Sequence, residues 1–229
     1  MKINKIKKAP KVLNAMLGPK IFCLSLQRTG TTSVGQFFKD HGFRVATWVV
    51  SRNNDFTTKW FKGDYESIFN SRAFKINQVF EDDPWWCSDF YKVLFHRFPK
   101  SKFVMLERNP DKWFDSMVKH SRGKSLGNTH LHATIYQRLY ELNKSEFENV
   151  NRYTSKIDNL LTLEEKHREH YVQFYKNRNN EVKDYFDFFG NNRLVTINLE
   201  DPKKWQVIGS FFDVDVDSSY EAHSNNSIV

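Results

Sequence analysis

The sequence is poor in cysteine. Cys23 and Cys87 are the only two in 229 residues, Cys23 within an apolar run and Cys87 beside a pair of tryptophans. Two cysteines supply neither a disulfide framework nor the clustered thiolates of a structural zinc site. The composition therefore excludes the small disulfide-rich secreted scaffolds, and we expect a reducing compartment, the cytoplasm.

Long apolar runs are missing too. No uninterrupted apolar stretch reaches the length of about 18 residues at which a membrane-spanning helix is considered. The first 20 residues hold six lysines and no acid, like the start of a signal peptide, but no apolar region follows before Ile21. We therefore expect a soluble, unanchored protein with a basic segment over residues 1–19. That segment could be a solvated tail, pack over a sheet edge or touch an acidic partner.

Glycine and proline are scarce, with nine and six residues, against 21 phenylalanines, nine tyrosines and six tryptophans. This balance is typical of a globular chain and excludes a disordered one. The length suits one sizeable α/β domain and is short for two. The formal charge of +8 fits a polyanionic ligand, with nucleic acid or an anionic membrane surface as the competing explanation.

The chain is organised around a polar turn between an apolar run and a helical pattern. Residues 21–26 predict a buried strand, and Val34, Phe37 and Phe38 predict the helix that follows. The turn between them consists of Arg28, Thr29, Gly30, Thr31, Thr32 and Ser33. Since the first N–H groups of a helix have no internal partner and the helix dipole is positive there, this junction predicts an anion site.

The stretch departs from the nucleotide-triphosphatase phosphate loop at the first glycine, where Ser25 stands, and at the lysine. When the stretch is aligned on G-x-x-x-x-G-K-[ST], Thr31 stands in the place of the lysine and Thr32 at the magnesium-binding hydroxyl. Arg28 is then the only full positive charge in the turn. A hydroxyl-rich cap on an ordinary helix would explain the Ser and Thr residues but leaves the arginine unexplained. The pattern therefore favours an anion-binding loop.

Two motifs resemble those of the sulfotransferases that use 3′-phosphoadenosine 5′-phosphosulfate (PAPS). The turn 28–33 resembles their 5′-phosphosulfate loop, and residues 102–116 resemble their 3′-phosphate motif, a strand ending in Arg108 with Ser116 eight residues later. A looser likeness to the small soluble members spans residues 20–226 and includes His223-Ser224-Asn225 near its end.

The resemblance implies a P-loop-like, nucleotide-kinase-like sulfotransferase fold with PAPS as donor substrate and no metal. Residues 28–33 would bind the 5′ phosphosulfate, while Arg108 and Ser116 would bind the 3′-phosphate. Arg28 would also be catalytic, because sulfuryl transfer requires the charge on the leaving phosphate to be neutralised. The acceptor would be a small molecule or a carbohydrate with a hydroxyl or amine, and nucleic acid is not an expected partner.

A local pattern recurs three times along the chain. Asp83-Pro84, Asn109-Pro110 and Asp201-Pro202 each follow an apolar run and precede a helical pattern. Asp or Asn is favoured as the N-cap of a helix and Pro at its first position. Repeated strand–helix units predict a single α/β domain over residues 20–229, with a central parallel sheet flanked by helices.

Hydrophobic periodicity predicts the remaining elements. The expected strands are residues 43–50, 73–80, 102–107 and 193–198, and the expected helices are residues 84–98, 163–189 and 205–212. Residues 121–157 are irregular and polar, which predicts a lid or an acceptor-binding insertion.

The acceptor needs a base, and Asp82 is the candidate. It follows the third predicted strand, at the edge of a parallel sheet where ligands bind. It also matches the Asp of an Asp-x-Pro turn in similar small sulfotransferases, whereas other members use His or Glu. A solvated turn carboxylate is the alternative for Asp82, and Asp83 is assigned as the N-cap.

Other residues stay open between function and packing. Trp85 and Trp86 could line an acceptor pocket or anchor a helix in the core. The pairs His130-x-His132 and His167-x-x-His170 are more often solvated or packing residues than metal ligands, so no metal site is predicted. The competing functions are a kinase or nucleotide hydrolase that uses ATP and magnesium, and a basic nucleic-acid-binding protein.

Overall fold

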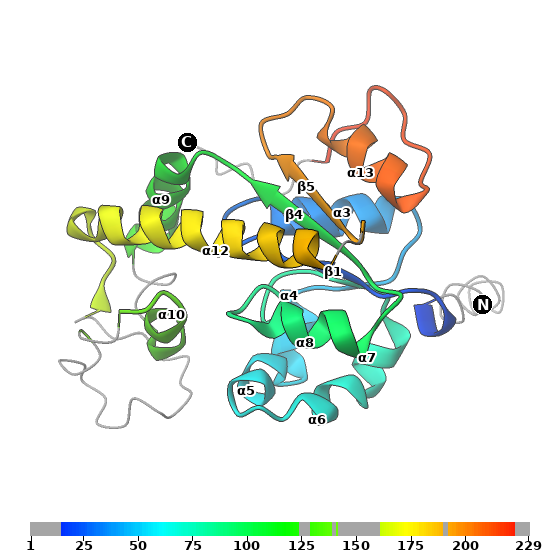
Figure 1. Cartoon of the computed structure of the whole chain (residues 1–229), viewed down its shortest axis with the longest axis horizontal. Helices are drawn as coiled ribbons and strands as arrows, with labels where there is room; N and C mark the ends of the chain where they lie inside the picture. Colours follow the sequence, from blue (N-terminus) through cyan, green and yellow to red (C-terminus); the bar gives the residue numbers. More distant parts are fainter. Residues whose placement is uncertain (1–14, 124–128, 139–140, 142–160, 190–191, 223–229) are drawn as a thin grey trace, which may run out of the picture. The chain divides into compact units, whose positions relative to one another are not determined.

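A computed structural model describes residues 15–123, 129–138, 141, 161–189 and 192–222 (Figure 1). They form two compact units: residues up to Glu107 together with those from Phe188 onward (unit 1), and residues from Arg108 to Asp187 (unit 2). None of the helices in these ranges is both long enough and apolar enough to cross a membrane.

Unit 1 contains a parallel sheet of five strands in the order β2-β3-β1-β4-β5. The strands are β1 (Ile21–Cys23), β2 (Val45–Ala46), β3 (Val79–Phe80), β4 (Lys102–Glu107) and β5 (Leu194–Asn198). The register pairs Phe22 with Phe80 on one side and with Phe103 on the other. Every strand therefore presents its carboxyl end at one edge, and β1, which leads into the polar turn, is central.

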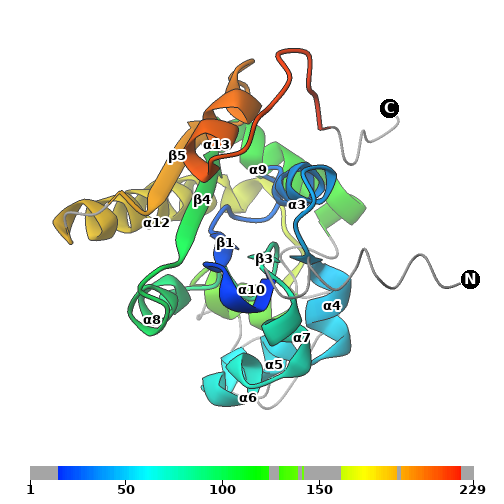
Figure 2. The same ribbon diagram turned by 90° about the vertical axis from the view of Figure 1, so that its right-hand side faces the viewer.

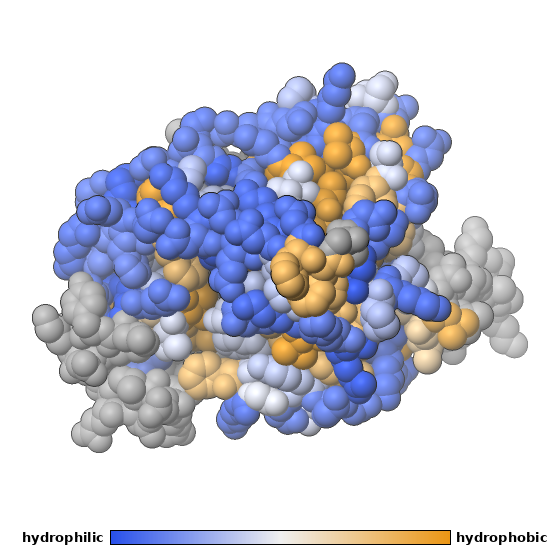
Figure 3. Space-filling view, in the orientation of Figure 1, coloured by the Kyte–Doolittle hydropathy of each residue, from blue (hydrophilic) through white to orange (hydrophobic). Residues whose placement is uncertain are grey.

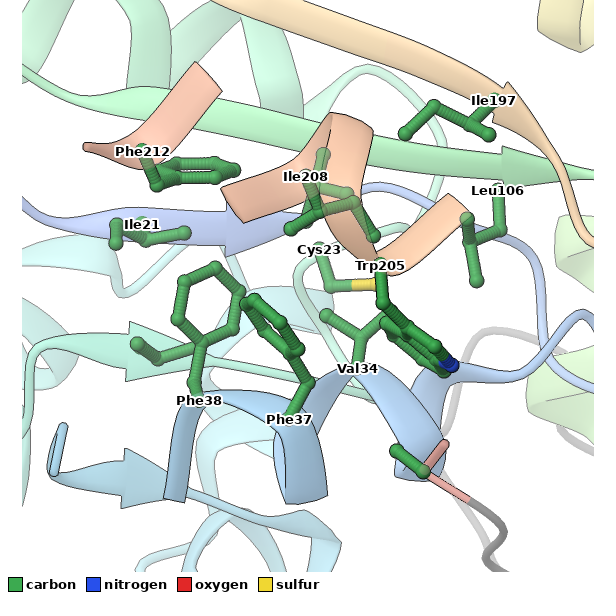
Figure 4. Close-up of a cluster of buried hydrophobic side chains, with 13 residues drawn as sticks. Ile21, Cys23, Val34, Phe37, Phe38, Leu106, Ile197, Trp205, Ile208 and Phe212 are labelled. Carbon is green, nitrogen blue, oxygen red and sulfur yellow. The ribbon is translucent and has the colours of Figure 1, made fainter. Parts of the chain in front are cut away.

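Helices cover both faces of this sheet (Figures 1 and 2). On one face lie α3 (Thr31–Asp40) and α13 (Lys204–Phe212), joined to β1, β3, β4 and β5 in one buried cluster. Figure 4 shows Phe37 and Phe38 of α3 turned toward Ile208, Phe212 and the strands. The Phe37 ring stacks on Trp205 at 5.4 Å between centroids. Burying this much aromatic surface is the main stabilising contribution on this face.

Phe22, Phe80 and Phe103 alternate to the other face and meet a second aromatic group. There Trp85, which is fully buried, lies 4.7 Å from Phe80 and 5.6 Å from Phe22. The helices in this part of the chain are α4 (Trp48–Asn53), α5 (Phe56–Phe61), α6 (Tyr65–Phe69), α7 (Arg72–Ile76) and α8 (Phe90–Arg97).

Three basic side chains stabilise the amino edge of the sheet by binding helix carboxyl ends. Lys20 Nζ donates to the carbonyls of Phe74, Lys75 and Asn77 at the end of α7. Lys102 donates to the Phe211 carbonyl of α13 at 2.7 Å. Arg193 donates to the Phe95 and Phe98 carbonyls at the end of α8. Each cation satisfies carbonyls that lack a partner in the helix and complements the dipole.

Unit 2 holds α9 (Pro110–Lys119), the 3-10 turns η1 (His120–Gly123) and η3 (Glu165–His167), α10 (His130–Ile135) and α12 (Arg168–Phe188). Its core is aromatic: Trp113 of α9 lies 4.7 Å from Tyr175 and 6.1 Å from Tyr171, both on α12. Arg168 ties the start of α12 to α9 by an ion pair with Asp115 at 2.6 Å.

The sequence-based elements differ from these in two strands. Residues 43–50 contain a strand of two residues, and α4 begins at Trp48 despite its β-branched Val49 and Val50. Residues 72–76 are the helix α7, so the third strand shortens to Val79–Phe80. Tertiary contacts override β propensity in such short segments. The strand predicted over residues 102–107 is confirmed.

Two of the three predicted proline junctions are also wrong in detail. Asn109 caps α9, with Pro110 at its first turn, as predicted. Asp83 caps no helix: its bond to Pro84 is cis, and α8 begins at Phe90 after Asp89. The N-cap of α13 is Lys203, while Asp201 accepts the Lys203 amide proton at 2.7 Å in the preceding turn. Residues 1–14, much of 121–157 and His223 to Asn225 lie outside the described residues.

Candidate functional site

The polar turn is anchored to the sheet before it reaches α3. The Leu24 amide donates to the Val104 carbonyl at 2.8 Å, which continues the β1 to β4 pairing. The buried Ser25 hydroxyl accepts the Leu106 amide proton at 2.7 Å. The turn therefore starts from a fixed point on the central strand, at the carboxyl edge of the sheet.

Gly30 gives the turn its shape. Its φ of 86° lies in the left-handed region that favours glycine, and it is the N-cap residue of α3. A Cβ built here would lie 2.8 Å from Leu199 Cδ1 and 3.3 Å from Leu106 Cδ1. Both the backbone conformation and the space thus require glycine at this position.

The first turn of α3 is arranged to receive an anion. Among the described residues, no side chain caps the helix, and the first intrahelical bond runs from the Val34 amide to the Gly30 carbonyl at 3.0 Å. The N–H groups of Thr31, Thr32 and Ser33 precede that bond, where the helix dipole is positive. No acidic residue stands in this turn to repel a phosphate or sulfate.

The side chains of the turn divide into two groups. Thr29 and Thr31 are buried, and the Thr29 hydroxyl bonds back to the Leu26 carbonyl. Thr32 is exposed, and Arg28 and Ser33 are partly exposed. Arg28 has a φ of 67°, a costly conformation for a residue with a side chain. Such strain is typical of ligand-binding turns. The Thr29 hydroxyl, by contrast, stabilises the turn through its bond to the Leu26 carbonyl.

Two carboxyl groups follow β3 at the same sheet edge. β3 is the hydrogen-bonded neighbour of β1, so Glu81 and Asp82 leave the sheet on the side from which the polar turn leaves it. Asp82 adopts a φ of 68°, and its Oδ1 accepts the Asp83 amide proton at 2.9 Å. Burial raises the pKa of Asp82, whereas the hydrogen bonds from Asp83 and the Trp86 indole lower it.

Glu81 is the residue that the sequence analysis passed over. It is 2% exposed, and a Cβ on Gly35 of α3 would lie 3.0 Å from its Cγ. Its Oε2 has no hydrogen-bond partner among the described residues. Burial and the nearby Asp82 raise the pKa of Glu81 to about 8, against the opposite effects of Lys39 and the Trp48 amide. The sequence signal for Glu81 was its position directly before Asp82, the candidate base.

Trp85 and Trp86 behave as core residues, and Asp83 close to them is partly exposed. Burial and the neighbouring Asp82 raise the pKa of Asp83 well above its ordinary range. Trp85 and Trp86 are both fully buried, and Trp85 packs in the core within its aromatic group.

The Cys23 thiol is buried next to Ser25, and burial raises its pKa to about 12. Cys23 and Cys87 are both buried and are not joined in a disulfide.

The second motif lies in unit 2. Arg108 is the residue between β4 and the cap of α9, and its amide donates to the Tyr175 hydroxyl at 2.9 Å. Ser116 lies two turns along α9 and is partly exposed. The polar turn and Asp82 belong to unit 1, whereas Arg108 and Ser116 belong to unit 2.

The histidines pack inside unit 2. His130 and His132 are buried, His132 bonds to the Thr129 hydroxyl at 3.0 Å, and burial lowers its pKa to about 4. His167 is buried between Glu141 and Arg138, at 3.0 and 3.2 Å from them. Within the described ranges, no group of three or more His, Cys, Asp or Glu side chains is placed to hold a metal ion.

Comparisons with known proteins identify a family. The model of the sulfotransferase domain family matches residues 20–227. Among solved structures, a sulfotransferase from Alicyclobacillus acidocaldarius is similar at 15% identity, with a TM-score of 0.44, over 90% of this chain and 86% of that chain. No curated protein matches the sequence.

Proposed function

The chain belongs to the sulfotransferase domain family, and on that premise we propose that it transfers a sulfuryl group from PAPS to a hydroxyl or amine of a small-molecule or carbohydrate acceptor. The observation that carries the proposal is the turn 28–33. It joins a central strand to a helix whose first N–H groups have no side-chain cap in the described chain, with Arg28 as its charge. This arrangement fits a doubly charged phosphosulfate.

Residues of both motifs would hold the donor, which supplies an activated sulfuryl group. The turn residues Arg28, Thr29, Gly30, Thr31, Thr32 and Ser33 would bind its 5′ side. Arg108, a guanidinium suited to bidentate bonding, would bind the 3′-phosphate with help from the Ser116 hydroxyl. The lysine of a triphosphate loop is replaced by Thr31, which supports a donor other than ATP.

Catalysis would require two contributions from the protein. Arg28 and the amides at the start of α3 would stabilise the negative charge that remains on the 5′-phosphate when its bond to sulfur breaks. Asp82 would accept the proton that the acceptor releases as its oxygen or nitrogen bonds to sulfur. Its raised pKa makes the Asp82 carboxylate a stronger proton acceptor than an ordinary aspartate.

A cytoplasmic location belongs to the same proposal. Its support is that both cysteines are buried and form no disulfide, so they need no oxidising compartment. The insertion over residues 121–157 is proposed to contribute to acceptor choice, and its described residues include α10 with its buried histidines.

The test is a calorimetric titration with 3′-phosphoadenosine 5′-phosphate (PAP), with and without magnesium, against ATP and 5′-AMP. We expect tight binding of PAP that magnesium does not change and that 5′-AMP, which lacks the 3′-phosphate, does not reproduce. Binding of ATP with magnesium, with no preference for the 3′-phosphate, would remove both the Arg108 assignment and the choice of donor.

A further inference from the structure

Arg108 stands between a strand and a helix cap, and its amide donates to a side chain of a distant helix. It follows the last residue of β4 and precedes Asn109, whose side chain caps α9 by accepting the amide protons of Asp111 and Lys112. The amide of Arg108 therefore belongs to neither the sheet ladder nor the helix. Its partner is the Tyr175 hydroxyl at 2.9 Å, from a residue 67 positions later.

Tyr175 is itself held firmly. Its side chain is 3% exposed, and its ring lies 4.7 Å from Trp113 with an interplanar angle of 42°. Trp113 belongs to α9, the helix that begins at Pro110 and carries Ser116 three residues after the tryptophan. One side chain of α12 thus contacts both the amide of Arg108 and the helix that presents Ser116.

A fixed amide restricts the direction of the side chain. The bond from the Arg108 amide sets the orientation of the preceding peptide plane, and with Asn109 held in the cap of α9 this limits the directions open to the Cα–Cβ bond of Arg108. A guanidinium that is already aimed loses less conformational freedom when it binds an anion. The effect of removing the hydroxyl should therefore appear in ligand affinity, and only toward the group that Arg108 binds.

We propose that Tyr175 is a positioning residue for recognition of the 3′-phosphate, acting through the backbone of Arg108 and the contact with Trp113. This inference rests on the proposed function, since it requires Arg108 to bind that phosphate. The ring of Tyr175 supplies packing, and the hydroxyl positions Arg108 and so strengthens the preference for a 3′-phosphorylated nucleotide.

The chain offers a matched control in Tyr171, one turn earlier on α12. It is fully buried and also packs against Trp113, at 6.1 Å, but its hydroxyl does not bond to Arg108. Tyr171→Phe removes the same atom from the same helix. General damage to α12 would affect both variants, whereas loss of positioning would affect Tyr175→Phe alone.

The experiment measures dissociation constants for PAP and 5′-AMP by calorimetry, with thermal melting of each variant. We expect Tyr175→Phe to weaken PAP binding by about two- to tenfold, the range for one lost hydrogen bond. Binding of 5′-AMP should stay unchanged, as should both ligands in Tyr171→Phe. With PAPS, Tyr175→Phe should raise KM and leave kcat within about twofold.

Arg108→Ala separates the two possible failures. If it weakens PAP binding while Tyr175→Phe does not, or if Tyr175→Phe weakens PAP and 5′-AMP equally, the positioning role is refuted and the proposed function stands. If Arg108→Ala leaves PAP binding unchanged, the 3′-phosphate assignment falls and the role of Tyr175 falls with it. Should Tyr175→Phe not fold, Trp113→Phe, which loosens the ring contact, is expected to reduce the preference for PAP in the same direction.

Discussion

Glu81 and Asp82 are neighbours in the chain with different surroundings. Glu81 turns toward α3 and lies against Gly35, where its carboxyl is almost wholly buried. Asp82 is partly exposed and stands in a left-handed turn. Burial raises the pKa of both carboxyls, but only the partly exposed Asp82 is accessible to exchange a proton with a ligand. We therefore assign proton acceptance to Asp82 and expect Glu81 to affect stability.

Asp82→Asn should reduce kcat by about 100- to 10,000-fold, the usual contribution of a general base, with unchanged PAP affinity. The base acts in its deprotonated form, so kcat/KM of the wild type should fall as pH drops through the raised pKa of Asp82. Steady-state assays across pH, with calorimetry for PAP, check both parts. Full turnover in the variant would assign the proton to another group.

Glu81→Gln should remove a pH dependence of stability. The folded pKa of about 8 lies above the ordinary value of 4.5, so protonated Glu81 favours folding. The contribution of Glu81 to the unfolding free energy should therefore be largest below pH 4.5 and be lost toward pH 8, with a slope approaching about 1.4 kcal/mol per pH unit. Urea unfolding at several pH values should show a flatter profile for the variant. Glu66→Gln, which removes an exposed carboxyl, should keep the wild-type slope.

At the scale of elements, those with local sequence signals could be predicted, and those that depend on tertiary packing could not. The polar turn, β4 and the Asn109 cap follow from local signals, because apolar runs and cap residues act within a few positions. The helices α4 and α7 were predicted as strands, because Val49, Val50 and residues 73–76 have apolar patterns that suit either a strand or a short helix. The burial of Glu81 could not be predicted either, since it depends on Gly35 in another element.

Gly209→Ala tests the closest packing of α13. Alanine normally stabilises a helix interior by up to about 1 kcal/mol over glycine. Here its Cβ would lie 2.3 Å from Val216 Cγ2 and 2.8 Å from the Val214 carbonyl oxygen. We expect a loss of about 1–3 kcal/mol in urea unfolding, the cost of overpacking, and a smaller loss when Val216→Ala is also present. Ser210→Ala, on the exposed side of α13, should change stability by less than about 0.5 kcal/mol. A stabilised Gly209→Ala would show that residues 214–216 shift easily.

At the scale of the whole molecule, the basic excess is only partly available to ligands. Lys20, Lys102 and Arg193 bind helix carbonyls at the amino edge of the sheet, opposite the polar turn. Hydrophilic residues cover most of the face in Figure 3, and hydrophobic residues form separate patches between them. A net charge read from the sequence therefore overstates the cations available to a nucleic acid.

PAP should stabilise the folded chain by mass action. At 100 times its dissociation constant a ligand adds about 2.7 kcal/mol, which for this length raises Tm by about 5–10 °C. Thermal melting with PAP, and with 5′-AMP at the same concentration, should show the larger shift for PAP. Arg108→Ala should reduce the PAP shift, whereas Arg97→Ala, at an exposed ion pair with Glu66, should preserve it. Equal shifts from both nucleotides would contradict a 3′-phosphate site.

The segment after α13 packs back against α3, the helix that follows the polar turn. Val214 and Val216 pass over Gly209, the Tyr220 hydroxyl donates to Asp40 of α3 at 2.8 Å, and Ala222 is buried in the same cluster. During synthesis, α3 leaves the ribosome early, but the residues that cover it leave after every strand of the sheet has been made. A nascent chain must therefore keep Phe37 and its neighbours exposed through most of translation, when chaperones would bind them.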